Sequence, residues 1–123
     1  EKRRFLVNKY DEFFKEVPSL IQPIKRINNC NPAWHLYVVH IDFESLGISR
    51  SSVINRLAEE GIGSQVHYIP LHWQPYYIKR YGKINLIGSE SYYSRCLSLP
   101  LHISMQEKDI TFVVEKLVNV LQK

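Results

Sequence analysis

The clearest hydrophobic pattern lies at the carboxyl end of the chain. Apolar side chains recur there every three or four residues over three turns, at Ile110, Val113, Val114, Leu117, Val118 and Leu121. Such a stripe predicts an amphipathic helix that packs against a core. Ser104 and Glu107 precede it at the spacing of a capping box, so we expect the helix to begin there.

Two further helices are predicted from the same periodicity. Residues 1–17 carry one apolar face, formed by Leu6, Tyr10, Phe13, Phe14 and Val17, and Pro18 is expected to end this helix. The next helix follows Ser49 as its amino-terminal cap and buries Val53, Ile54, Leu57 and Ala58. Gly61 stands where a left-handed residue closes a helix, and Ile62 supplies the apolar contact that accompanies such a closure.

Strands are predicted where apolar, aromatic and β-branched residues run together. Residues 34–43 are apolar on both faces, which is typical of a buried interior strand. We expect a second strand at residues 64–69 and a third at residues 96–99, which Pro100 ends. Residues 18–32 read as an irregular connection with a short extended piece around residues 24–27.

Residues 70–82 are rich in aromatic residues and are expected to form a long loop or a broken helical segment. A short helix is expected at residues 91–95. The resulting order of elements implies an α/β or α+β two-layer sandwich, in which helices cover one side of a small sheet.

Composition limits the class of protein. The chain has 123 residues, 45% hydrophobic and 23% charged, which suits one globular domain. Its apolar runs are far shorter than the roughly 20 residues that cross a bilayer, and no basic and apolar leader opens it, so we expect no membrane partner and a cytoplasmic location. Cys30 and Cys96 are then expected to be reduced thiols.

The net charge of +4 is concentrated in residues 1–26, which carry seven basic and four acidic side chains. A basic patch confined to Lys2, Arg3 and Arg4 is a weak signal for nucleic acid, so we expect no such partner. The chain begins at Glu1, and its only methionine is Met105. We therefore expect a piece of a longer polypeptide.

Few residues suggest chemistry on their own. The chain has no phosphate-binding glycine loop, dinucleotide fingerprint or nucleophile elbow. His67 and His72 are separated by four residues, and Pro70 between them argues against a helix that could bring them together, so we assign no metal ligands. They read either as packed, hydrogen-bonded residues or as a site at a strand end. Arg50 opposes the dipole of its own helix and faces either solvent or an anion.

Five groups of residues resemble the carboxyl-terminal part of the DegT/StrS sugar aminotransferases, in the order of that family. They are Ile48-Ser49-Arg50, Gly61-Ile62-Gly63, Val66-His67-Tyr68-Ile69-Pro70-Leu71-His72, Gln74-Pro75-Tyr76-Tyr77 and Leu97-Ser98-Leu99-Pro100-Leu101. The residues between 67 and 77 are most similar to the aminotransferase that acts on a UDP-linked 4-keto-6-deoxy sugar in pseudaminic acid synthesis.

This resemblance implies the small carboxyl-terminal domain of a fold type I pyridoxal phosphate enzyme, a homodimer that moves an amino group from glutamate to a UDP-sugar. Residues 1–17 would link it to an absent large domain, and residues 18–123 would form the small domain. His67, Tyr68, His72 and Arg50 would border the substrate.

No catalytic or cofactor-binding residue carries over, because the Schiff-base lysine belongs to the large domain. The chain alone is therefore expected to bind no pyridoxal phosphate and to be inactive. It would act with a large domain or a full-length subunit. The alternative is a non-catalytic remnant or interaction module that binds a full-length relative.

Overall fold

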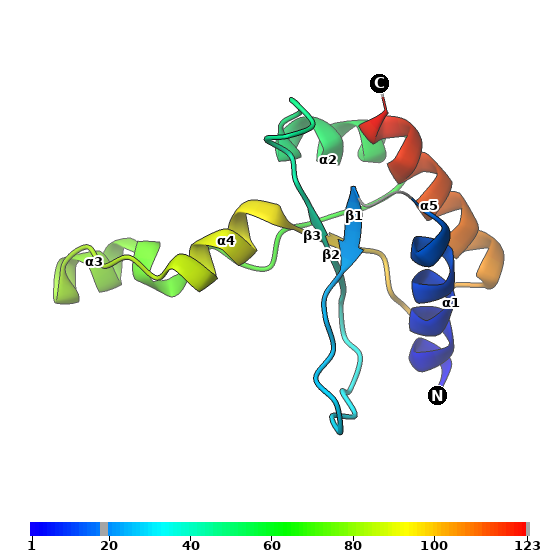
Figure 1. The fold of residues 1–123 in the computed structure, drawn as a ribbon, viewed down its shortest axis with the longest axis horizontal. Coiled ribbons are helices and arrows are strands. Elements are labelled where there is room, and N and C mark those ends of the chain that lie inside the picture. The colour runs from blue at the N-terminus through cyan, green and yellow to red at the C-terminus, as the bar shows by residue number, and fades with distance from the viewer. Residues whose placement is uncertain (18–19, 123) are drawn as a thin grey trace.

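The computed structural model describes residues 1–17 and 20–122 (Figure 1). Along the chain its elements are α1 (Lys2–Glu16), β1 (Ile21–Pro23), β2 (Tyr37–Ile41), α2 (Arg50–Glu59), the 3-10 turn η1 (Leu71–Trp73), α3 (Pro75–Tyr81), α4 (Ile87–Arg95), β3 (Cys96–Leu99) and α5 (Glu107–Leu121). Within the described residues, no helix is both long enough and apolar enough to cross a membrane.

The sheet is small and antiparallel, with β2 between β1 and β3. Tyr37, Val39 and Ile41 of β2 are buried on one face, whereas Val38 and His40 are half-buried on the other. The predicted interior strand is thus confirmed at the centre of the sheet, although it is shorter than residues 34–43.

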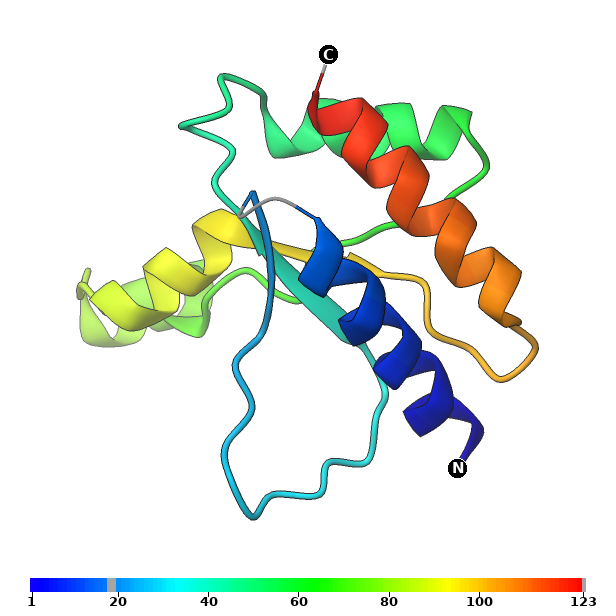
Figure 2. The ribbon, with the colours of Figure 1, turned by 45° about the vertical axis from the view of Figure 1, so that its right-hand side comes forward.

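Helices α1, α2 and α5 form a layer over one face of the sheet, as Figures 1 and 2 show. α5 packs against both α1 and α2, and α1 also contacts β1. The core lies between these helices and the sheet. Its fully buried side chains include Leu6, Tyr10, Val39, Leu57, Leu97, Ile110 and Leu117. The expected two-layer α+β architecture is confirmed.

Helix ends follow local sequence rules. Ser49 caps α2 by accepting a hydrogen bond from the Ser52 N–H at 3.1 Å. Gly61 has φ +77°, and it donates to Ala58 while Ile62 donates to Leu57, at 2.9 and 2.8 Å. These two bonds form a Schellman closure, and the buried Ile62 completes it.

The start of α5 and the end of α1 were both predicted from the sequence. The capping box of α5 is formed by Gln106 and Asp109, so the prediction of Ser104 and Glu107 was two residues early. Ser104 instead shares a hydrogen bond with His102 at 2.9 Å. α1 ends at Glu16 with Val17 extended, and Pro18, expected to end this helix, lies outside the described residues.

The predicted strand at residues 64–69 is wrong. The backbone of this segment pairs with the sheet only through an isolated bridge between Gln65 and Ser98. The chain then turns away from the sheet, and Tyr68 and Ile69 are exposed. Continued pairing with β3 would have kept these residues at the sheet. In place of the strand expected at residues 64–69, the sheet contains β1, which lies just before the extended piece expected at residues 24–27.

Residues 71–95, which contain η1, α3 and α4, form an extension that we call the arm. Both views show it projecting away from the sheet and its helical layer (Figures 1 and 2). Neither α3 nor α4 contains a buried residue. The broken helical segment expected at residues 70–82 is confirmed, and the helix expected at residues 91–95 begins four residues earlier, at Ile87.

Candidate binding site at the base of the arm

His67 lies where the chain leaves the sheet. Its Nδ1 shares a hydrogen bond of 2.8 Å with the hydroxyl of Ser98, a buried residue of β3. The two backbones are joined two residues before His67, where Gln65 and Ser98 exchange two hydrogen bonds, at 3.1 and 2.8 Å. This contact fixes the imidazole at the edge of the sheet.

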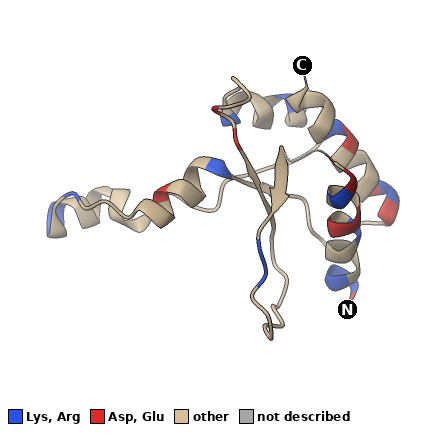
Figure 3. Ribbon diagram, viewed as in Figure 1, with Lys and Arg blue, Asp and Glu red and all other residues tan. Residues whose placement is uncertain are grey.

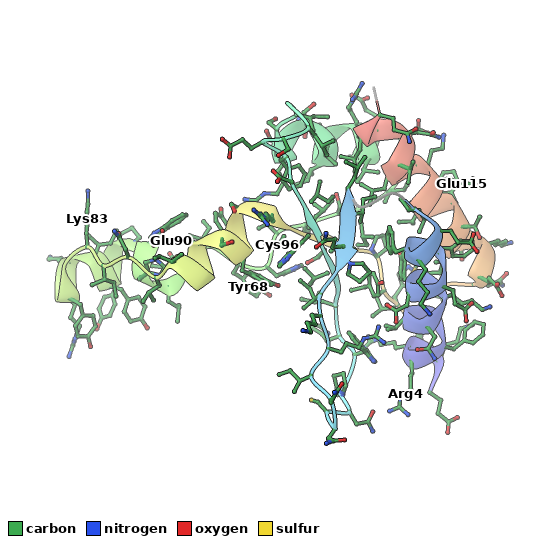
Figure 4. The ribbon with its side chains drawn as sticks, viewed as in Figure 1. Arg4, Tyr68, Lys83, Glu90, Cys96 and Glu115 are labelled. Carbon is green, nitrogen blue, oxygen red and sulfur yellow. The ribbon has the colours of Figure 1, made fainter. Side chains whose placement is uncertain are left out.

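Tyr68 is the most accessible of the four predicted site residues. It is 72% exposed, at the base of the arm (Figure 4). Its ring meets the His67 ring edge-on, with centroids 4.8 Å apart, across a cis peptide bond. The phenol therefore presents both a ring face and a hydroxyl to whatever approaches this side of the arm.

His72 is buried and already has a partner within the chain. Its Nε2 lies 3.0 Å from Oε1 of Glu90, which also accepts the N–H of Leu86 at 2.9 Å. The hydrogen bond from Leu86 and, to a smaller extent, that from His72 hold the pKa of the Glu90 carboxyl below its usual 4.5. The carboxylate thus ties η1 to the start of α4.

Arg50 is half-buried and contacts the carboxyl end of α4. Its Nη1 donates to the carbonyl oxygen of Tyr93 and, at 3.3 Å, to that of Cys96. Its guanidinium also lies over the ring of Tyr93, 4.6 Å from the centroid. The sequence left two partners open for Arg50, solvent or an anion. The structure instead places its guanidinium against backbone carbonyl groups and an aromatic ring.

The four predicted residues converge on one region, although their roles differ. His67 is hydrogen-bonded to Ser98 of β3, and Arg50 donates to the carbonyl oxygen of Cys96, two residues earlier in the same strand. A chain of aromatic contacts connects His72 with Arg50 through Trp73 and Tyr93.

Sequence reasoning missed the connecting residues, which are Glu90, Trp73 and Tyr93. Eighteen positions separate Glu90 from His72, and no local pattern marks that pairing. No local pattern distinguishes Tyr93 from the other tyrosines of the chain.

The lysines of the described residues do not suit pyridoxal phosphate. Lys2, Lys15, Lys25, Lys79, Lys83 and Lys108 are exposed. Lys116 pairs with Glu60, and Lys9 pairs with Glu12 and Glu107, which raises the pKa of Lys9. A lysine that holds pyridoxal phosphate must lose its proton, so the groups facing Lys9 oppose that role.

The described residues also hold no cluster of metal ligands. Across residues 1–17 and 20–122, no group of three or more histidine, cysteine, aspartate or glutamate side chains could hold a metal ion. Cys30 and Cys96 are free thiols, one exposed and one buried. Burial raises the pKa of the Cys96 thiol, which favours its protonated form.

Comparison with known proteins gives consistent matches over nearly the whole chain. Residues 1–118 match the model of the DegT/DnrJ/EryC1/StrS aminotransferase family. SpsC, a spore coat polysaccharide biosynthesis protein of Bacillus subtilis strain 168, is 36% identical over 125 residues, which cover 99% of this chain and 32% of SpsC.

Two solved structures have the same fold. PseC of Helicobacter pylori, an aminotransferase involved in the biosynthesis of pseudoaminic acid, matches 98% of this chain and 32% of its own at a TM-score of 0.87 and 22% identity. Spr1654 of Streptococcus pneumoniae, assigned as a sugar aminotransferase and solved in its PLP form, matches 98% of this chain and 31% of its own at 0.77 and 25%. This chain thus spans about a third of the length of these proteins.

Proposed function

Because the chain belongs to the DegT/DnrJ/EryC1/StrS aminotransferase family, we propose that it is the carboxyl-terminal part of a nucleotide-sugar aminotransferase. The observation that carries this proposal is a family match over residues 1–118 combined with coverage of only a third of SpsC and PseC. Residues 1–17 then link it to a large domain, and residues 18–123 form the small domain. The reaction is amino transfer from glutamate to a UDP-linked 4-keto-6-deoxy sugar.

Pyridoxal phosphate supplies the electron sink for transfer of an amino group when it is bound. The paired or exposed lysines described above do not fit that group. The part of the enzyme outside this chain therefore holds it, and this chain alone binds none and is inactive.

Within that enzyme, His67 and Tyr68 border the sugar-nucleotide cleft. The exposed ring of Tyr68 offers a flat apolar face to a sugar or base, and its hydroxyl offers a hydrogen bond. The bond from His67 to Ser98 fixes the backbone from which Tyr68 projects. His72 and Arg50 support this wall through other groups of the chain, His72 through Glu90 and Arg50 through the carboxyl end of α4.

The arm is the surface that meets the rest of the enzyme, either the large domain or a second subunit of a homo-oligomer. Large apolar side chains are concentrated on it and just before it: Tyr68, Ile69, Leu71, Trp73, Tyr76, Tyr77, Tyr81, Ile84, Leu86 and Ile87 are all exposed. Such a patch is rare on a surface that stays in water. The outer part of the arm carries Lys79, Arg80 and Lys83, which favours an acidic facing surface (Figure 3).

We place the protein in the cytoplasm. The two cysteines are unpaired, and the exposed Cys30 would be prone to oxidation outside a reducing compartment. Periplasmic or extracellular recovery of the folded protein would contradict this location.

The test uses a fusion protein in which this chain replaces the matching third of SpsC. Purified fusion protein is loaded with pyridoxal phosphate and assayed with glutamate and UDP-linked 4-keto-6-deoxy sugars, beside intact SpsC. We expect amino transfer by the fusion. A matched fusion carrying Leu71→Asp and Ile87→Asp, two exposed arm positions, should fold but lose activity.

The same parts supplied as separate chains test the alternative of an interaction module. If this chain co-purifies with the truncated SpsC and the fusion is inactive although it holds pyridoxal phosphate, the interaction module is favoured. If the chain neither binds the truncated SpsC nor supports activity in the fusion, both functions are wrong.

A further inference from the structure

Arg50 stands at the first position of α2, where a cation opposes the dipole of its own helix. The partner of its guanidinium is the opposite end of another helix. α4 ends at Arg95, and Arg50 donates to the carbonyl oxygens of Tyr93 and Cys96 at that end. Carbonyl groups at a helix carboxyl end lack partners within the helix and attract cations, so this contact is favourable.

The ring of Tyr93 extends this contact into the arm. Arg50 covers it, with the guanidinium carbon 4.6 Å from the centroid, and the edge of Trp73 meets it at 5.5 Å. Trp73 follows His72, whose bond to Glu90 reaches the first half of α4. One continuous set of side chains therefore joins the core helix α2 to both ends of α4 and to η1.

Besides the chain connection from Arg95 into β3, the helices of the arm have little buried contact with the core. α3 and α4 contain no buried residue, and α4 reaches the core through its contacts with β2, among them Tyr92 edge-on against His40 at 5.1 Å. The direction of a helix with so little buried surface depends on the groups at its base. Arg50 supplies both a charged hydrogen bond and a stacked ring there.

We propose that Arg50 is a positioning residue that fixes the arm on the core, with Tyr93 and Trp73 passing this restraint to η1. Its guanidinium donates to the free carbonyl groups at the carboxyl end of α4 and does not bind a substrate phosphate. The restraint itself is independent of the reaction, and its purpose rests on the proposed function, since it holds the Tyr68 segment at the cleft.

Arg56 provides a matched control within the same helix. Its Nη1 also donates to a carbonyl near a helix end, that of Val120 in α5, at 3.0 Å. The two arginines thus make the same kind of bond from α2, one to the arm and one to the core. Loss of either should loosen only the helix that it holds.

The experiment measures amide hydrogen exchange by mass spectrometry on the purified 123-residue chain. In Arg50→Ala we expect the protection of α4 to fall by about 10-fold or more while that of α5 is unchanged. In Arg56→Ala we expect the carboxyl end of α5 to lose protection and α4 to keep it. Tyr93→Phe retains the ring and the carbonyl and should match the parent chain.

A spectroscopic signature separates positioning from general stability. Trp34→Phe leaves Trp73 as the only tryptophan. In that background Arg50→Ala should change the emission and acrylamide quenching of Trp73, Arg50→Lys should restore part of the signal, and Arg56→Ala should change neither.

Three results would overturn the proposal: unprotected α4 in the parent chain, equal loss in both helices from both alanine variants, or unchanged α4 protection in Arg50→Ala. If Arg50→Ala does not fold, Arg50→Lys replaces it in the same comparison of α4 with α5. None of these measurements uses activity, so a failure here is distinct from a failure of the SpsC fusion.

Discussion

Replacement of Leu57 by alanine should remove a large part of the stability of this chain. Leu57 lies on α2, is 0% exposed and belongs to the core that α2 shares with α5. The arm residue Leu71 is the matched control, since it has the same side chain but is 68% exposed. The pair compares burial in the core with exposure on the arm.

The expected magnitude follows from burial. Truncation to alanine removes about three buried carbons at about 0.8 kcal/mol each, or about 2.4 kcal/mol. The cavity left between packed helices adds to this, which gives about 3–5 kcal/mol in free energy of unfolding. A domain of this size has about 5–15 kcal/mol in total. Leu71→Ala should change stability by no more than about 0.5 kcal/mol.

Urea denaturation followed by circular dichroism measures both variants. We expect Leu57→Ala to lower the midpoint strongly at an unchanged slope, and Leu71→Ala to match the parent. If Leu71→Ala cost as much as Leu57→Ala, the arm would be part of the stable core and the description of its surface as free for a partner would be wrong. A cost below about 1 kcal/mol for Leu57→Ala would refute the placement of the core.

Three further predictions concern single groups. Gly61→Ala should cost about 1–2 kcal/mol in thermal unfolding, because its φ of +77° is strained for any side chain; Gly63→Ala, which also has open space at Cβ, should cost under about 0.5 kcal/mol. Tyr10→Phe should cost about 1–3 kcal/mol, since its buried hydroxyl donates to a backbone carbonyl at 2.9 Å; a neutral result in urea denaturation would remove that bond from the account. The pKa of Glu90 is lowered on folding, so its stabilising contribution is present above pH 4.5 and is lost as pH falls below that value. Melting temperatures from about pH 5 to about pH 3 should therefore fall less in Glu90→Gln than in the parent, and equal slopes would contradict the hydrogen bonds of this carboxylate with Leu86 and His72.

Local sequence rules predicted the elements whose signals are short-range. The stripe ending at Leu121 predicted α5, and Ser49 with Gly61 predicted both ends of α2. β3 was predicted with its observed bounds, because Pro100 marks its end. Each of these depends on residues within about four positions, the range over which helix caps and proline act.

Elements that depend on distant partners were not predictable in the same way. Residues 64–69 have the composition of a strand, but only Gln65 pairs with β3 before the chain leaves for the arm. The partners of Arg50 lie more than 40 positions away, at Tyr93 and Cys96. The sequence marked Arg50 as anomalous for its helix, whereas only the fold supplied the helix end that explains it.

The central claim is that this chain supports an aminotransferase site without holding its cofactor. The most direct test incubates the purified chain with pyridoxal phosphate, reduces it with borohydride and maps the modified lysines by peptide mass spectrometry. We predict negligible labelling or labelling scattered over the exposed lysines. Stoichiometric modification of a single lysine would contradict the claim, because this domain would then hold the cofactor itself.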